Sequence, residues 1–424
     1  MSGAHIAQAT TGGRVFKGIP TTLLWSSVLL PFGLLTTNIT FRLPIPETVP
    51  LAFVLVCGLL IVLRGHLRHP ALLCAPLLIA AYGACGLLTA RPVDGLRIMG
   101  SAIVFLVASQ LTLASLPKAS RISVYVLVVL RVLSLIFPGP IAGFYSALGL
   151  RGADVYDGGA SVLFAEPSYL ASAVFALWAV GRMGMVQTKS HLHALDICAA
   201  ALLLLSFSAS AAAYALVGML ICLRKRPLLL ASAGAMALGL FSWLIAAEGT
   251  RVRTLVEAIW ALIREGGISA FVLIDPSATL RMSTTFLAIV AVIDAPFGQF
   301  RLEMTHLIGI ASQMDTLGVI TGNPLLETFA GNLQGNTVLL QLLLYGGWPL
   351  FLVLAFPAWL AAVRLWKLRR VEPASILVLA ALASGCLVQS LLTSPFLYLC
   401  ILVGLYWPYR LSQLERAAGA AAAG

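Results

Sequence analysis

The chain has 424 residues, of which 60% are hydrophobic and only 10% are charged. Its mean hydropathy of +0.98 lies far outside the usual range of soluble proteins, so we predict an all-α membrane protein. The net charge of +11 does not indicate nucleic-acid binding, because the basic loops of a membrane protein face anionic lipid.

Long apolar segments recur along the whole chain. A membrane-spanning helix needs about 20 predominantly apolar residues, because lipid cannot form hydrogen bonds with an exposed backbone. The apolar run from Leu195 to Leu223 is longer than one such helix needs, and we divide it at "SFSASAAAY" (206–214). We then predict about twelve spans, at residues 20–38, 47–63, 71–89, 97–115, 121–137, 163–181, 193–208, 210–223, 227–247, 334–360, 374–392 and 394–409.

Charge sets the orientation of these helices. With a cytoplasmic N-terminus, most Lys and Arg residues fall on the cytoplasmic side, as the positive-inside rule requires. Acidic residues fall outside, apart from Asp196, Glu372 and Glu415. Both termini are then cytoplasmic, and the alanine-rich end of the chain is predicted to be disordered. The predicted parts are an N-terminal tail with the first nine helices (1–247), a large external loop (248–333), the last three helices (334–409) and a cytoplasmic tail (410–424).

The external loop carries helical patterns of its own. In "RVRTLVEAIWALIREGG" (251–267) the apolar residues form one stripe, opposite charged residues such as Arg253 and Glu257. This pattern predicts an amphipathic helix that lies on the membrane surface. Two further helices are predicted in the loop, at 277–298 and around 301–317.

A carboxylate at the start of the sixth span is the first candidate for a catalytic base. A reaction on the outer face has no access to ATP, so a lipid diphosphate would have to supply the energy. Glu166 directly precedes Pro167, which suits the first position of a helix. The dipole at the helix N-terminus keeps such a carboxylate ionised. The alternative is that Glu166 only caps the helix or pairs with Arg151.

A departing diphosphate needs cations to hold it. Arg281 and Arg301 are candidates because guanidinium groups make bidentate contacts, and the alternative for each is an ion pair within the loop. His306, the only histidine predicted outside, is a second candidate base or a structural residue. Arg131, the only charge well inside a span, indicates function, with snorkelling to the surface as its alternative. Metal ligands do not cluster, so we expect no metal and no cofactor.

Three stretches carry a resemblance to a known family. They are Glu-Pro-Ser at the start of a span (166–168), an arginine before an apolar helix that ends in "DAPFG" (281–298), and "GNTVLLQLLLYGGWPLFLVL" after the loop (335–354). They resemble the O-antigen polymerase and ligase superfamily. The resemblance implies a glycosyltransferase-C-like bundle with a large periplasmic loop in the bacterial inner membrane. It also implies action on undecaprenyl-diphosphate-linked glycans without metal or nucleotide sugar, with Arg281 on the diphosphate.

Two departures separate this chain from the ligase branch. That branch has a histidine at the end of the loop, where this chain has Asn336, and an arginine in a tight turn, where this chain has "SFSASA". Asn336 can orient a hydroxyl group but cannot act as a base at neutral pH. We therefore predict a polymerase of O-antigen or exopolysaccharide repeat units, in which the catalytic residues Glu166 and Arg281 meet in one hollow.

The remaining expectations concern binding and partners. The predicted partners are undecaprenyl-diphosphate-linked oligosaccharide, membrane lipid and a chain-length regulator protein. One alternative is a ligase that transfers glycan to lipid A core or protein. Another is a transporter of lipid-linked glycan, which should show ionisable residues or broken helices near the midplane. The predicted substrate-binding residues are Arg151, Ser168, Arg301, His306, Asn336 and Arg131.

Overall fold

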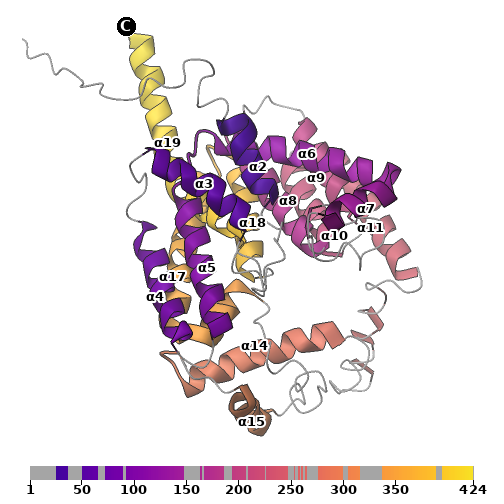
Figure 1. The fold of residues 1–424 in the computed structure, drawn as a ribbon. Helices are drawn as coiled ribbons and strands as arrows, with labels where there is room; N and C mark the ends of the chain where they lie inside the picture. The colour runs from indigo at the N-terminus through magenta and orange to yellow at the C-terminus, as the bar shows by residue number, and fades with distance from the viewer. Residues whose placement is uncertain are drawn as a thin grey trace, which may run out of the picture.

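The structure, a computed structural model, is built from helices throughout the residues that it describes (Figure 1). No strand occurs among them, which confirms the predicted all-α class for this part of the chain. The described residues are 25–36, 50–64, 72–88, 92–147, 163–164, 167–185, 193–206, 209–224, 226–246, 276–298, 304–315, 337–387 and 394–423, with several positions between 253 and 264.

The helices follow the predicted apolar segments, each of which overlaps at least one helix. The break between α9 and α10 confirms that the run from Leu195 to Leu223 is divided, and α7 is a helix outside the predicted spans. The bounds are η1 (a π-helix, Trp25–Leu29), α2 (Leu30–Leu35), α3 (Leu51–Arg64), α4 (Cys74–Leu87), α5 (Pro92–Ser109), α6 (Leu116–Ile136), α7 (Pro138–Ala147), α8 (Pro167–Arg182), α9 (Ala194–Leu204), α10 (Ala209–Leu223), α11 (Pro227–Ala246), α14 (Pro276–Asp294), α15 (Met304–Met314), α17 (Val338–Leu368), α18 (Ser375–Leu387) and α19 (Pro395–Ala423).

Helix length bears on the predicted number of spans. Within the described residues, α6 and α17 are long and apolar enough to cross a membrane. Shorter apolar stretches of 10–17 residues lie in α4, α5, α9, α10, α14 and α18. A span of the usual kind takes about 20 residues. Two helices of sufficient length are weak support on their own, so the number of spans stays a prediction.

Helix α8 occupies the centre of the bundle. Every residue from Leu170 to Gly181 is buried, and the helix packs against α6, α9, α10, α18 and α19. Trp178 of α8 is among the largest fully buried side chains, and Phe175 stacks on Tyr214 of α10 with ring centroids 4.9 Å apart. A helix that is apolar on all sides is expected to be buried in this way. The Glu-Pro-Ser stretch therefore leads directly into the core.

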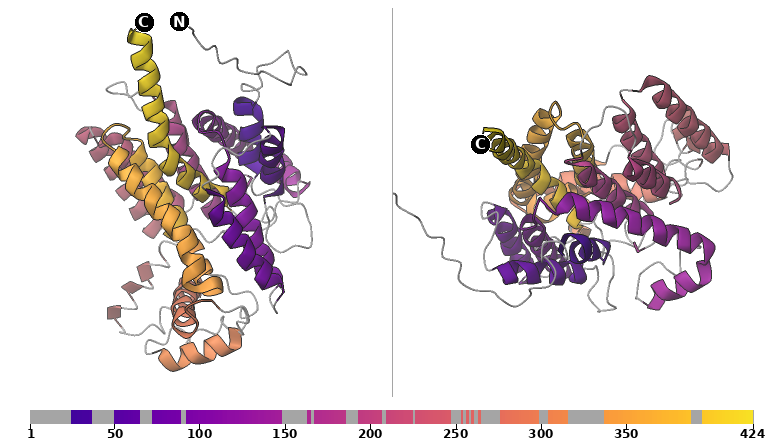
Figure 2. Two further views of the ribbon diagram at one scale, coloured as in Figure 1. Left: turned by 90° about the vertical axis from the view of Figure 1, so that its left-hand side faces the viewer. Right: turned by 90° about the horizontal axis from the view of Figure 1, so that it is seen from above.

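The two ends of the bundle carry different elements. The helices α14 and α15 lie at the end opposite to the C-terminal part of α19 (Figure 1). The long helix α6 crosses over α8 and α9, whereas α5 and α17 run along the bundle (Figure 2). The two helices of spanning length are therefore not parallel to each other.

Two predictions about exposed segments have different outcomes. The loop helices α14 and α15 confirm the helices expected at 277–298 and around 301–317. The predicted disorder of the C-terminal tail is wrong, because α19 continues to Ala423. Alanine has the highest helix propensity of all residues, and an alanine-rich end continues a helix that has already formed.

Candidate functional site

Half of the residues predicted to act on substrate, four of eight, fall outside the part of the chain that the structure describes. The expected meeting of Glu166 and Arg281 therefore stays a prediction. Helix α8 does begin at Pro167, so Glu166 directly precedes a helix, as expected. The predicted residues that lie outside the described residues are Arg151, Glu166, Arg301 and Asn336.

The other predicted residues lie on separate elements. Arg281 is in the second turn of α14, and His306 is exposed on α15. Ser168 is half-buried in the first turn of α8, where its carbonyl oxygen accepts a hydrogen bond from Ser172 Oγ at 3.2 Å. Arg131 lies in α6. Among the arginines predicted to bind substrate, it is the one whose side chain the structure describes.

Arg131 is buried, with 2% of its surface exposed. Its Nε and Nη2 atoms donate to the carbonyl oxygen of Leu205 at 3.0 and 2.5 Å, and its Nη1 donates to Ser134 Oγ at 3.3 Å. Leu205 is the C-cap of α9. A cation at a helix C-terminus can donate hydrogen bonds to a free carbonyl group and interacts favourably with the helix dipole. The guanidinium is therefore buried in the protein and caps a neighbouring helix.

The chain breaks between α9 and α10, and a buried serine lies in the described part of this break. The helices have 11 and 15 residues, or about 16 and 22 Å, which is less than the roughly 30 Å of a bilayer core. Ser206 in the break is buried, and its Oγ donates to Leu203 O at 2.6 Å. Arg131, Ser134, Leu205 and Ser206 form what we call the turn cluster. This cluster holds one guanidinium in a fixed position.

Removing the Arg131 guanidinium should weaken the fold. Methionine at this position keeps much of the volume but leaves the Leu205 carbonyl without the donors that Arg131 supplies. We expect Arg131→Met to lower the free energy of unfolding by about 1–3 kcal/mol, measured by thermal unfolding in detergent. Arg131→Lys should lose less, because an ammonium can still donate to that carbonyl. Equal stability of the methionine variant and the native protein would contradict the capping role.

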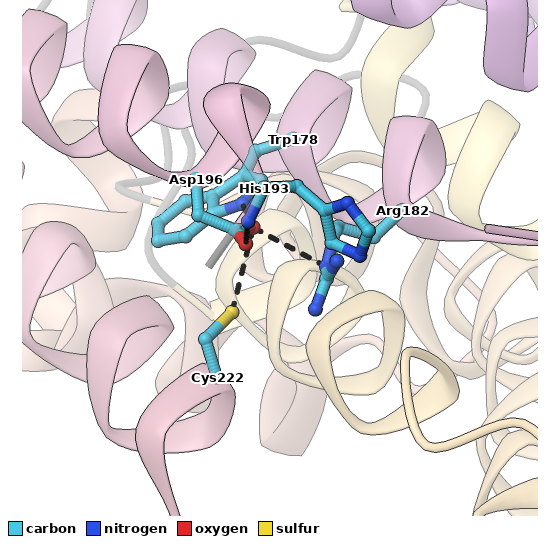
Figure 3. Close-up of polar contacts among 5 residues, drawn as sticks. All are labelled: Trp178, Arg182, His193, Asp196 and Cys222. Atoms are coloured by element: carbon cyan, nitrogen blue, oxygen red, sulfur yellow. Dashed lines mark hydrogen bonds and ion pairs between the residues drawn. The ribbon is translucent and has the colours of Figure 1, made fainter. Parts of the chain in front are cut away.

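A second polar cluster surrounds Asp196, in the first turn of α9 (Figure 3). The carboxylate is fully buried. Trp178 Nε1 donates to its Oδ1 at 2.8 Å, Arg182 Nε forms an ion pair with Oδ1 at 3.2 Å, and the backbone N–H of His193 donates to Oδ2 at 2.9 Å. The Cys222 thiol lies 3.7 Å from Oδ1. We call these five residues the Asp196 junction, and they join α8, α9 and α10.

Contacts continue from this junction to the connection between α17 and α18. Glu372 is buried there, and its Oε2 accepts a hydrogen bond from the backbone N–H of Gly184 at 3.3 Å. Burial raises the pKa of the Glu372 carboxyl, while the N–H groups of Gly184 and Ala374 and the charge of Arg182 partly offset that rise. The carboxylates of Asp196 and Glu372 thus both accept hydrogen bonds from backbone N–H groups of the protein. This arrangement is typical of carboxylates with a structural role.

The sequence alone did not identify the Asp196 junction. One signal was present, because Asp196 follows His193 by three residues at the start of an apolar run, the spacing of an N-terminal capping box. The partners Trp178 and Cys222 come from other helices, and their spacing in the sequence gives no hint of the contact.

The described residues contain no group of three or more His, Cys, Asp and Glu side chains that could hold a metal ion. Of the groups predicted to act on substrate, the described residues include the Arg131 guanidinium in the turn cluster, the exposed His306 and the loop helix that carries Arg281. Comparisons of the chain with protein-family models, with curated proteins and with solved structures find no match.

Proposed function

We propose that the protein is a membrane-embedded glycosyltransferase that polymerises undecaprenyl-diphosphate-linked oligosaccharide repeat units at the periplasmic face of the bacterial inner membrane. The product is an O-antigen or exopolysaccharide chain. One observation carries the proposal: two of the three stretches that resemble the polymerase and ligase superfamily pack against each other. The carbonyl oxygen of Pro296, in "DAPFG", accepts a hydrogen bond from the Trp348 N–H, in "YGGW", at 2.9 Å.

Exposed apolar stripes support a location in the membrane. Soluble proteins rarely expose contiguous apolar patches, whereas lipid-facing helices do so over their whole length. On α3 and α17 the exposed apolar side chains recur every third or fourth residue, which puts them on one face of each helix. These residues are Leu55, Leu59 and Val62 of α3, exposed by 66, 60 and 75%, and Leu352, Phe356 and Trp359 of α17, exposed by 54, 62 and 62%.

The arrangement of the ends supports the proposed topology. The loop helices α14 and α15 lie at the end of the bundle opposite to the C-terminal part of α19 (Figure 1). This is the arrangement expected when the loop is periplasmic and the C-terminus is cytoplasmic. Helix α14 also exposes Met282, Ile289 and Ile293 along one face, which suits a helix that lies at the membrane surface.

The turn cluster supports a cation close to the reaction. In the ligase branch of the superfamily that this chain resembles, an arginine lies in a tight turn between two helices, and "SFSASA" lacks it. Here the Arg131 guanidinium reaches the corresponding turn from α6, by its hydrogen bonds to Leu205 O. We infer that Arg131 supplies the positive charge at this turn, and that a short, broken pair of helices leaves room for a polar substrate there.

In the proposed reaction Glu166 takes a proton from the acceptor hydroxyl, or orients an arginine that binds the donor. The hydroxyl oxygen forms the new glycosidic bond as the sugar–phosphate bond of the donor breaks. Arg281, helped by Arg151 or Arg301, stabilises the departing undecaprenyl diphosphate. The loop covers the site and excludes water, so that hydrolysis of the donor does not compete with transfer.

Reconstitution of the purified protein tests this function. Proteoliposomes should contain only undecaprenyl-diphosphate-linked repeat units, with a chelator present and nucleotides absent. We expect a ladder of longer lipid-linked glycans. Movement of the donor across the bilayer without lengthening would instead indicate a transporter. Transfer only to added lipid A core or protein would indicate a ligase.

Glutamine in place of Glu166 should stop elongation at an unchanged protein abundance, because an amide cannot accept the hydroxyl proton. General acid–base catalysis contributes about 10²–10⁴-fold, and we expect a loss in that range. Glu257→Gln is the matched control, since it makes the same substitution at an exposed carboxylate of the external loop, which is paired with Arg253. An active Glu166→Gln variant would remove Glu166 from the reaction.

A further inference from the structure

Helix α14 ends in a close backbone contact with α17. The chain turns directly after the helix, where Gly298 N donates to Ala295 O at 3.0 Å. The carbonyl oxygen of Pro296 accepts a hydrogen bond from Trp348 N at 2.9 Å. Helix α14 packs against α17 and α15, so this contact joins the loop helices to the bundle.

The contact requires glycine on both sides. Gly298 has φ +92°, and a Cβ added to it would lie 2.6 Å from the carbonyl carbon of Gly346. Gly347 has φ +61°, and its added Cβ would overlap the Pro296 carbonyl and lie 2.5 Å from Gly298 N. Only glycine adopts such φ values without a steric penalty. Any larger residue at either position would therefore separate the two backbones.

The same contact explains the break in α17. Gly347 is not helical, and Pro349 follows it within the first turn of the new helical segment, where proline is favoured. The break frees the Trp348 N–H from the helix, and Pro296 O accepts it. A backbone N–H that has lost its helical acceptor needs another partner, so the end of α14 and the break in α17 stabilise each other.

We propose that Gly298 and Gly347 are positioning residues that set where Arg281 meets the diphosphate. This inference rests on the proposed function. Arg281 lies 15 residues before Pro296, or about 22 Å along a helix. A small change of angle at the contact therefore moves Arg281 by several ångströms, and a misplacement of about 1 Å can cost about 100-fold in rate.

Alanine at Gly347 and, separately, at Gly298 tests the proposal in the full-length protein. We expect kcat for elongation to fall by about 10–100-fold, with KM for the lipid-linked repeat unit little changed and abundance unchanged. Gly309→Ala is the matched control: it lies in α15, and an added Cβ there meets nothing within 4 Å. This control should elongate at the native rate.

A double-variant measurement distinguishes positioning from a general loss of structure. If Gly347 acts through Arg281, Gly347→Ala should cost far less in an Arg281→Lys background than in the native one, because the bidentate contact is already lost. A general structural defect would lower the elongation rate by the same factor in the native and the Arg281→Lys backgrounds. Equal factors would overturn the proposal.

Hydrogen exchange of the Trp348 amide reports on the contact without relying on activity. We expect faster exchange in Gly298→Ala and Gly347→Ala than in the native protein or in Gly309→Ala. Faster exchange of the Trp348 amide in either alanine variant, together with a native elongation rate, would overturn the positioning role. Unchanged protection of this amide in both alanine variants would also overturn it. Failure of the proposed function looks different, because the native protein itself would then extend no donor.

Discussion

Alanine in place of Arg281 is expected to abolish chain elongation, with a loss of about 10³-fold or more. Arginines that stabilise a charged phosphoryl transition state contribute about 10³–10⁵-fold in other enzymes, and a departing lipid diphosphate makes the same demand. Arg281 is in the second turn of α14, the loop helix that packs on the bundle through α17. Lysine should restore only part of the rate, because a point charge cannot replace a bidentate fork.

The measurement is the initial rate of elongation in proteoliposomes, normalised to folded protein. Arg264→Ala is the matched control, since it removes an exposed arginine of the same loop and the same charge. We expect the control to keep at least about half of the native rate, as removal of one distant, screened surface charge has a small effect. Native elongation by Arg281→Ala would remove this residue from the site.

Segment length and periodicity predicted most of the helices. Apolar runs of sufficient length gave helices because backbone groups in an apolar environment must bond within the segment. The division at "SFSASAAAY" and the loop helix α14 were predicted for the same reason, as local patterns decide them. The alanine-rich tail is helical and not disordered as predicted, because alanine favours the continuation of a helix that has already formed.

The polar clusters could not be predicted, because their members are distant in the sequence. The position of Arg131 in an apolar run predicts a functional residue, but its partner Leu205 is 74 residues away, and the sequence does not indicate this contact. The contact of Pro296 with Trp348 joins stretches that the sequence marked only separately. Periodicity predicts which face of a helix is buried but not which helix packs against that face. The packing of α6 across α8 and α9 therefore could not be predicted from the sequence.

Removing the Asp196 carboxylate is expected to cost more stability than removing the Arg131 guanidinium. Asp196→Ala leaves the Arg182 guanidinium, the Trp178 indole N–H and the His193 N–H without their acceptor in a site where the carboxylate is fully buried. Loss of one partner of a buried ion pair costs about 3–5 kcal/mol. The exposed pair Arg253–Glu257, with side chains exposed by 38 and 55%, should lose only about 0.3–0.5 kcal/mol in Glu257→Ala.

Thermal unfolding in detergent measures both variants, and Asp196→Asn separates charge from shape. The asparagine keeps one oxygen for Trp178 or for the His193 N–H but gives Arg182 no countercharge, so its stability should fall between the native protein and Asp196→Ala. Because the junction joins α8, α9 and α10, loss of Asp196 should also loosen the α9–α10 turn that Arg131 caps. An Asp196→Ala variant no less stable than Glu257→Ala would show that the buried carboxylate does not hold these helices together.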